Sequence, residues 1–267
     1  MRRLLAAGAA AALLLLTACG GPTPAAKPTP APPPPTASAA PVPADHACYR
    51  LTYHQALDIT TTGTDVSCRD AHTSETYAVG QLPVVVDGHL LAVTSQRAQD
   101  AAARRCPARL GAFVGSSRNA LRLTMLRAVW FVPTPAQAAA GAAWYRCDAI
   151  EVSGESLGTL HRGLAGALHH GAGRYGMCGT AKPGTSGFAR VPCGDKHSWA
   201  AISTVPLKPG GYPGVSAVRS AGTSACKTAA KRVAASVLKY QWGYEWPTAA
   251  EWKAGQTYGI CWAPDES

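Results

Sequence analysis

The chain has 267 residues, a formal net charge of +10 at pH 7 and nine cysteines. About 220 residues remain once the N-terminal segments described below are set aside, which is enough for one large or two small domains. The positive charge alone would suit any polyanion and does not exclude nucleic acid. The export signal described next does exclude it.

The N-terminus has the features of a secretory signal. Two arginines precede an apolar stretch from Leu4 to Leu16. That stretch is shorter than the roughly 20 residues needed to span a bilayer and fits the apolar region of a signal peptide. The residues that follow, Leu16-Thr17-Ala18-Cys19, resemble the bacterial lipobox. This resemblance implies cleavage after residue 18 and acylation of Cys19, as in palmitate-carrying lipoproteins; an ordinary signal peptide is the alternative.

Residues 19–46 are expected to be the lipid anchor and a disordered linker. The segment after Cys19 contains ten of the 21 prolines and hardly any large apolar side chain, so it cannot bury enough surface to fold. As a polyproline spacer it would reach on the order of 80 Å at about 3.1 Å per residue. We therefore expect the remainder of the chain on the outer face of the cytoplasmic membrane, held there by the lipid anchor.

The other eight cysteines show the same spacing twice. Gaps of 20, 38 and 41 residues separate the first four, and gaps of 15, 33 and 35 separate the second four. An even number of cysteines in an exported chain implies disulfides, and four per half allow three pairings. We favour bonds that close a hairpin-like element and tie a helix to the last strand. These bonds are Cys48–Cys68, Cys106–Cys147, Cys178–Cys193 and Cys226–Cys261.

Other residues repeat with the cysteines. Cys68-Arg-Asp70-Ala-His72 and Cys193-Gly-Asp195-Lys-His197 share the pattern C-x-D-x-H, and Pro133, Gly141 and Cys147 each recur 114 residues later. Such ordered recurrence indicates a tandem repeat. We expect a first repeat at residues 47–153, a Gly- and His-rich connector at 154–174 and a second repeat at 175–267.

Apolar patterns predict strands around the first cysteine, after each C-x-D-x-H element and at the fourth cysteine. The strands in question are Cys48 to Leu57, Thr76 to Val79, Trp144 to Ile150, Trp199 to Val205 and Tyr258 to Trp262.

A helix is predicted to carry the third cysteine of each half. In the first half Cys106, Leu110 and Phe113 share one helical face, although Pro107 should break or kink the helix. In the second half the corresponding face would hold Cys226, Ala230, Val233 and Val237.

A short second helix is predicted before the last strand of each half. Thr134 to Gln137 and Thr248 to Glu251 are capping boxes, and Gly141 and Gly255 supply the left-handed residue that ends the helix. The predicted fold class is α+β, with two tandem homologous disulfide-stapled domains. Each would be an antiparallel sheet with one main helix and one short helix.

Together these features resemble the septum formation domain family of actinobacterial envelope proteins. Its members carry a first-strand Cys, a Cys followed by an acidic residue, His and often Glu, a helical Cys, and a Pro-to-Gly segment that runs into a terminal Cys. Val66 to Glu75 and Pro133 to Cys147 match this pattern. The second half matches too, but has Ala200 in place of Glu75. The resemblance implies an envelope location and a link to division, and it brings no catalytic residues.

The polar residues of the two C-x-D-x-H elements are the candidate site. A zinc site would need thiolate or at least three protein ligands, and Cys68 is expected in a disulfide. Acid–base catalysis would need an activated nucleophile or a second carboxylate, and no such motif accompanies them. The third interpretation is structural: the Asp caps a turn and the His bonds to backbone. These candidates are Asp70, His72, Glu75, Asp195 and His197.

Positive charge gathers in the same part of each half. Seven basic residues and no acidic one lie between Asp100 and Asp148, and the same is true between Asp195 and Glu245. A solvated basic face is one interpretation, and binding of anionic lipid headgroups or wall polymers is the other. The helical candidates for anion binding are Arg104, Arg105, Arg109, Lys227, Lys231 and Arg232.

We therefore expect a non-enzymatic extracytoplasmic lipoprotein that binds or scaffolds envelope or division proteins, without catalytic residues, metal or cofactor. The alternative is an extracytoplasmic enzyme or metal-binding module centred on the two C-x-D-x-H elements.

Overall fold

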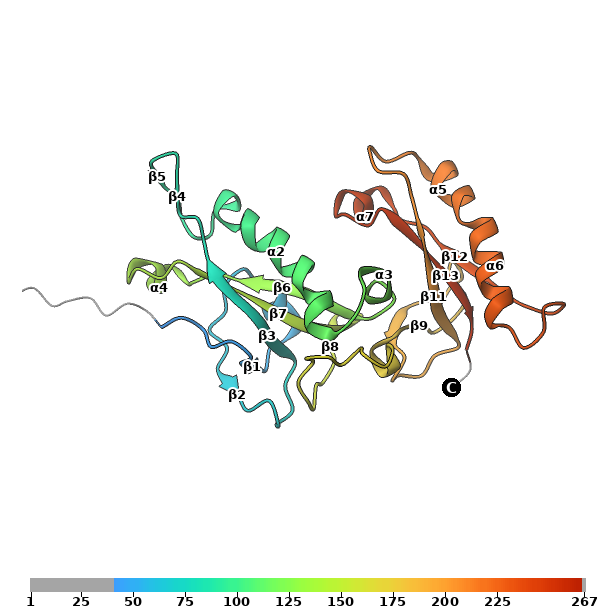
Figure 1. Cartoon of the computed structure of the whole chain (residues 1–267), viewed down its shortest axis with the longest axis horizontal. Coiled ribbons are helices and arrows are strands. Elements are labelled where there is room, and N and C mark those ends of the chain that lie inside the picture. The colour runs from blue at the N-terminus through green and yellow to red at the C-terminus, as the bar shows by residue number, and fades with distance from the viewer. Residues whose placement is uncertain (1–40, 266–267) are drawn as a thin grey trace, which may run out of the picture. The chain divides into compact units, whose positions relative to one another are not determined.

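The computed structural model describes residues 41–265 (Figure 1). The expected signal peptide, the lipidation site Cys19 and the linker up to residue 40 lie outside the described residues. By its contacts the described chain falls within one compact unit, residues 38–267. None of the helices in residues 41–265 combines the length and hydropathy that crossing a bilayer requires.

Two antiparallel sheets organise the fold, so the predicted α+β class is confirmed. The first has the strand order β2-β1-β3-β7-β6, with β8 added to β7, and the second has the order β10-β9-β11-β13-β12. Each strand of the second sheet therefore has a counterpart at the same place in the first. The strands are β1 Cys48–Tyr49, β2 Asp65–Val66, β3 Ser74–Gln81, β6 Leu126–Phe131, β7 Trp144–Ser153, β8 Ser156–Leu157, β9 Met177–Gly179, β10 Arg190–Pro192, β11 Trp199–Pro206, β12 Gly243–Glu245 and β13 Tyr258–Pro264.

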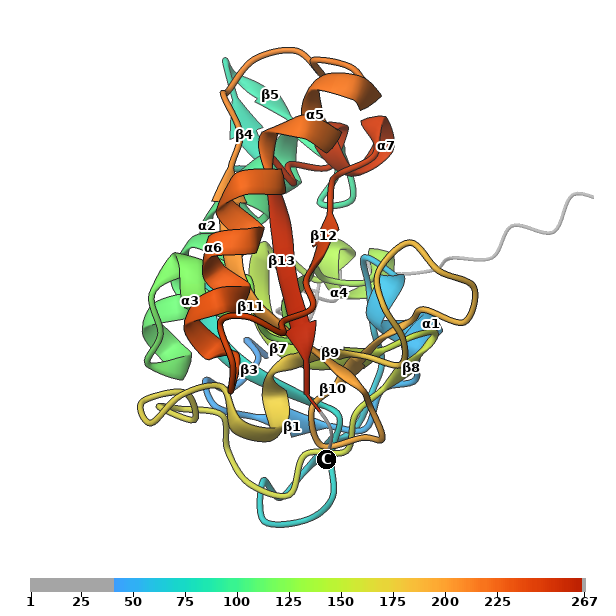
Figure 2. The ribbon, with the colours of Figure 1, turned by 90° about the vertical axis from the view of Figure 1, so that its right-hand side faces the viewer.

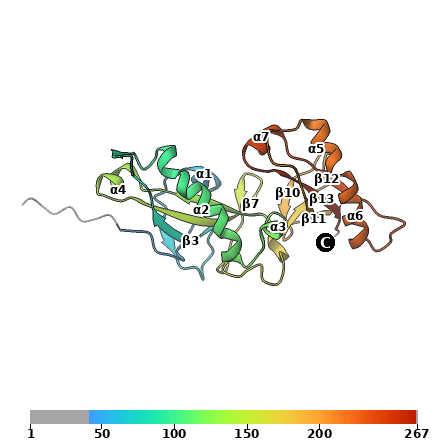
Figure 3. The ribbon, with the colours of Figure 1, turned by 45° about the horizontal axis from the view of Figure 1, so that its top comes forward.

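One face of each sheet is covered by helix. The main helix of the first half, α2 (Gln96–Val114), lies along β6 and β7 (Figure 3). In the second half two consecutive helices take this place, and the longer one lies along β13 and β11 (Figure 2). The remaining elements are α1 Tyr53–Leu57, β4 Val85–Val86, β5 His89–Leu90, α3 Arg118–Leu121, α4 Pro135–Ala139, η1 Gly173–Tyr175, α5 Val215–Ala221, α6 Thr223–Val233 and α7 Ala249–Lys253.

The two short helices begin and end as predicted. In α4 the Thr134 hydroxyl accepts from the backbone N–H of Gln137, whose side chain accepts in return from the N–H of Thr134. The α7 helix has the same reciprocal pair between Thr248 and Glu251. The glycines that follow have positive φ angles, 90° at Gly141 and 99° at Gly255, a conformation that costs other residues energy.

The strand predicted from Cys48 to Leu57 is wrong beyond its first two residues. β1 ends at Tyr49, and α1 follows. The cause is a third capping box, in which Thr52 and Gln55 satisfy each other's backbone N–H groups. Such a box favours a helix start over an extended chain.

The predicted break at Pro107 and the predicted buried face of the second main helix are both wrong. Pro107 does not interrupt α2, which continues to Val114; the burial of Cys106 and Leu110 on the face against the sheet offsets the missing N–H. In the second half α6 ends at Val233, so Val233 and Val237 are exposed rather than on the buried face with Cys226 and Ala230.

The eight cysteines of the folded region are paired as expected. One bond in each half joins the first strand to the turn that precedes the long third strand, β3 or β11. The other joins the main helix to the last long strand, β7 or β13. The four cysteines of the helix-to-strand bonds are fully buried: Cys106, Cys147, Cys226 and Cys261.

The connector is packed onto the first half. Leu160, Leu164 and Leu168, four residues apart, are buried in the same apolar cluster as α2 residues. Leu160 also exchanges two backbone hydrogen bonds with His72, at 3.0 and 2.8 Å. Residues 154–174 are thus structurally part of the first half, and they cover its C-x-D-x-H element.

Candidate functional site

The two C-x-D-x-H elements form the same turn. The backbone N–H of Asp70 donates to the Ser67 carbonyl, and that of Asp195 donates to the Pro192 carbonyl, each at 2.9 Å. The second cysteine of each half lies inside this turn. Its position brings the sulfur next to the first strand, where the disulfide closes.

Each histidine folds back over its turn. Nδ1 of His72 donates to the Asp70 carbonyl at 2.8 Å, and Nδ1 of His197 donates to the Asp195 carbonyl at 2.7 Å. Because a carbonyl oxygen only accepts, this bond places a proton on Nδ1 in both rings. The structural interpretation of the histidines predicts this backbone bond.

The aspartates do not cap the turns as expected. Among the described residues the Asp70 carboxylate accepts no hydrogen bond, and it is exposed. Asp195 accepts only a long bond from the Ser153 hydroxyl, at 3.4 Å. In the first turn the hydroxyl of Ser67 takes the capping role, since it accepts from the Arg69 N–H.

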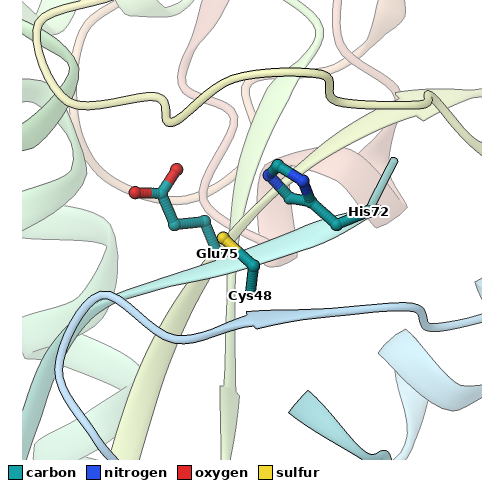
Figure 4. A group of neighbouring side chains, drawn as sticks. All are labelled: Cys48, His72 and Glu75. Carbon is teal, nitrogen blue, oxygen red and sulfur yellow. The ribbon is translucent and has the colours of Figure 1, made fainter. Parts of the chain in front are cut away.

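In the first half His72 and Glu75 lie beside the sulfur of Cys48 (Figure 4). One donor atom of each residue is within 4.8 Å of the other two. His72 is 1% exposed and Glu75 is 3% exposed, with the connector above them. The carboxylate of Glu75 accepts the backbone N–H of Leu164. Nε2 of His72 has no hydrogen-bond partner in the part of the chain that the structure describes.

The electrostatics of this cluster follow from its burial. Loss of water raises the pKa of Glu75, and this effect exceeds the opposing effects of the Leu164 hydrogen bond and of His72. The carboxyl group is therefore easier to protonate in the folded protein than in the unfolded chain.

The second half has a related cluster around His197, but its carboxylate comes from another place in the chain. Ala200 pairs with Cys178 on neighbouring strands as Glu75 pairs with Cys48, so the strand supplies no carboxylate there. Asp265, the residue after β13, lies instead with its Oδ2 3.7 Å from Nε2 of His197. The His197 side chain is 4% exposed, whereas that of Asp265 is 57% exposed.

The donor atoms of these clusters do not fit a zinc site. Cys48 and Cys178 are bonded to other sulfurs, so neither offers a thiolate. Each cluster is left with one histidine and one carboxylate, fewer than the three protein ligands that a catalytic zinc needs. Both histidine side chains are also almost fully enclosed.

A buried ionic network on the other face of the first sheet was not predicted. Asp148 accepts from the Thr76 hydroxyl at 2.7 Å and the Ser74 hydroxyl at 2.8 Å, and its carboxylate lies 3.2 Å from the Arg146 guanidinium. That guanidinium stacks 3.7 Å above the Tyr49 ring. Burial raises the pKa of Asp148, and Arg146 opposes the shift. The sequence signal was two opposite charges flanking Cys147 in a mainly apolar strand.

Two of the seven arginines in the basic stretch of the first half do not contribute to an exposed basic surface. Arg146 is buried, and half-buried Arg127 donates to the carbonyls of Thr124 and Leu126, so neither belongs to a basic surface. Burial lowers the pKa of Arg127. The six helical candidates for anion binding are all exposed: Arg104, Arg105 and Arg109 on α2, and Lys227, Lys231 and Arg232 on α6.

The septum formation family matches the chain over residues 124–261, about half of its length. The match includes β6 and β7 of the first half, the connector and the second half up to Cys261. No curated protein and no solved structure matched the chain.

Replacing Glu75 with Gln should flatten the pH dependence of stability. A folded pKa above the unfolded value, about 4.3, means that the native state binds more protons. The free energy of unfolding of the parent then falls as the pH rises from that value through the folded pKa. Glutamine keeps an acceptor for Leu164 without the charge. We expect Glu75→Gln to be more stable than the parent at pH 7 and equal to it below about pH 4.

Urea unfolding between pH 3.5 and 8 measures this difference, with the exposed Glu155→Gln as the matched control. A constant difference across that range would show that burial of the charge is not the cause.

Removing Asp148 should be far more harmful than removing Asp70. Asp148→Ala leaves the Arg146 charge buried without its partner, which costs about 3–5 kcal/mol. Asp70→Ala removes an exposed carboxylate and should change the free energy of unfolding by less than about 0.5 kcal/mol. Urea unfolding at pH 7 compares the two. Equal losses would mean that the turn depends on its aspartate after all.

Proposed function

We propose that this chain, which belongs to the septum formation family, is a non-enzymatic lipoprotein of the cell envelope with a binding or scaffolding role in septum formation. In this proposal the lipid on Cys19 holds it on the outer face of the cytoplasmic membrane. Residues 19–46 then act as a spacer between the lipid anchor and the folded region.

The observation that carries a binding role is the division between buried and exposed polar groups. His72 and His197 are each held against a disulfide-bonded turn by the same backbone hydrogen bond, with nearly all of their surface enclosed. The six basic side chains of α2 and α6 are exposed instead. Polar groups buried beside a disulfide support the fold, while exposed charges are available to a partner.

The α6 charges favour an anionic partner. Lys231 and Arg232 lie four and five residues after Lys227 on one helix. No acidic residue occurs from residue 196 to residue 244. A basic surface of this kind attracts polyanions and speeds their encounter. Outside a cytoplasmic membrane the polyanions are anionic headgroups and acidic wall polymers. Envelope and division proteins are the further partners proposed.

The alternative, an enzyme or metal-binding module at the C-x-D-x-H elements, gains no support from the geometry. Each element would need a third ligand or an opening to solvent. In residues 41–265 no third ligand accompanies His72 or His197, and both imidazole rings are almost fully enclosed.

Cys19→Ala should separate the anchor from the folded region. The folded region keeps its four disulfides, but without acyl chains it loses the main contribution to its membrane binding. In dividing cells we expect a tagged parent in the membrane fraction and concentrated at septa, and the variant in the soluble extracytoplasmic fraction. A variant that stays fully in the membrane fraction would contradict the lipid anchor. A parent spread evenly along the envelope would contradict the septal role.

The triple variant Lys227→Gln, Lys231→Gln and Arg232→Gln should bind anionic surfaces weakly. Each basic residue near such a surface contributes about 1 kcal/mol, so the affinity should fall by roughly two orders of magnitude. Sedimentation with phosphatidylglycerol vesicles and with acidic wall polymer, at 50 to 500 mM salt, measures it.

The matched control for this triple variant removes three exposed lysines outside α6, by Lys196→Gln, Lys208→Gln and Lys253→Gln. An equal loss in both triple variants, or binding that salt does not weaken, would show that α6 is not the anion-binding helix.

A further inference from the structure

The loop between α6 and β12 exposes large apolar side chains. It spans residues 234–242, and in Figure 1 it extends away from the second sheet beyond the end of α6. Val237 is 63% exposed, and Leu238 is 90% exposed, the highest value among the large apolar side chains of residues 41–265. Val233, the last residue of α6, is 59% exposed. Leaving such side chains in water costs free energy unless something covers them.

The first half has the same order of strands and helices, but its segment after the main helix is covered. In the first half the chain that follows α2 enters α3, and Leu121 packs against the first apolar core. Leu123 packs against the cluster that contains Met125 and Met177. The same place in the chain is therefore covered in one half and open in the other.

Basic residues surround the exposed loop. Lys231 and Arg232 precede it on the last turn of α6, and Lys239 lies within it; all three are exposed. From residue 215 to residue 244 there is no aspartate or glutamate. The charged residues that flank the apolar tip in the chain are therefore all positive.

Aromatic rings lie beside the two lysines of α6. The Lys231 Nζ lies 5.3 Å from the centre of the Tyr240 ring, and the Lys227 Nζ lies 5.4 Å from that of the Trp242 ring. Tyrosine and tryptophan favour the headgroup level of a bilayer, because one part of the ring system is apolar and another forms hydrogen bonds. Lysine and arginine can extend from an apolar setting to reach phosphate groups.

We propose that residues 233–242 form an interfacial loop that inserts Val237 and Leu238 into an anionic lipid bilayer. Lys231, Arg232 and Lys239 then lie at the phosphate groups. A bilayer fits better than an acidic polymer, because a hydrated polymer has no apolar phase for Leu238. This inference rests on the proposed membrane location and identifies the lipid as the partner of the α6 region.

The test uses the mature full-length chain with Cys19→Ala, so that acyl chains do not mask the loop. Its probes are phosphatidylglycerol–phosphatidylcholine vesicles and soluble polyphosphate. Val237→Ser with Leu238→Ser should weaken vesicle binding about tenfold or more and leave polyphosphate binding unchanged. Val85→Ser with Leu90→Ser is the matched control, since this exposed Val and Leu lie on the β4–β5 hairpin. It should change neither.

Retention of vesicle binding by the Val237 and Leu238 variant would overturn the insertion but leave the basic helix in place. A parent that binds neither probe would overturn the proposed anion binding as well. An equal loss of vesicle binding in the hairpin control would show that any exposed apolar pair contributes to binding. That result would overturn the assignment to this loop. A parent that is dimeric in solution and becomes monomeric in the variant would make a second copy, rather than lipid, the occupant.

Discussion

The disulfide between the main helix and the last long strand is the constraint on which each half depends. Cys106 and Cys147 in one half, and Cys226 and Cys261 in the other, are fully enclosed and fix a helix against the centre of a sheet. The pairing of the sheet is irregular beside the same bond. In both halves the long third strand shifts its register opposite that cysteine, between Thr76 and Ala78 in β3 and between Ala201 and Ser203 in β11. A small domain with little core gains most from such a cross-link, because it restricts the unfolded chain.

The same framework accommodates two different interiors. Behind the helix-bonded strand the first half buries the Arg146–Asp148 pair, while the equivalent positions of the second half, 114 residues later, hold Ile260 and Trp262. Trp262 is fully buried and meets Phe188 edge to face. A paired charge network and an apolar core of similar volume can serve the same place in a fold. The buried Arg146–Asp148 pair is therefore explained by its place in the fold.

The enclosed polar side chains and the exposed basic side chains thus differ in what they contact. The histidines of the C-x-D-x-H elements are used in closing turns beside disulfides, although their sequence suggests a reactive site. The exposed cations of α2 and α6 have few competing acids nearby, and the loop after α6 adds apolar and aromatic groups to one of these helices. Whether the two halves arose by duplication stays a prediction, to which the matching strand orders and disulfides conform.

Features with a short-range or periodic cause could be predicted from the sequence alone. Cysteine spacing indicated the repeat, and the expected hairpin and helix-to-strand contacts favoured one of the three pairings in each half. Thr134 with Gln137 and Thr248 with Glu251 marked helix starts, and the α+β class followed from strand and helix periodicity. The tertiary structure decided what depends on distant neighbours. Arg146 became buried because Asp148 of the same strand pairs with it and the Tyr49 and Phe131 rings lie under its guanidinium. The connector packed because its leucines face the first core. Val233 and Val237 became exposed because α6 ends at Val233 and the chain that follows leaves the buried helical face. Helical spacing gives a residue a direction on its helix, but only the rest of the fold determines whether anything lies in that direction.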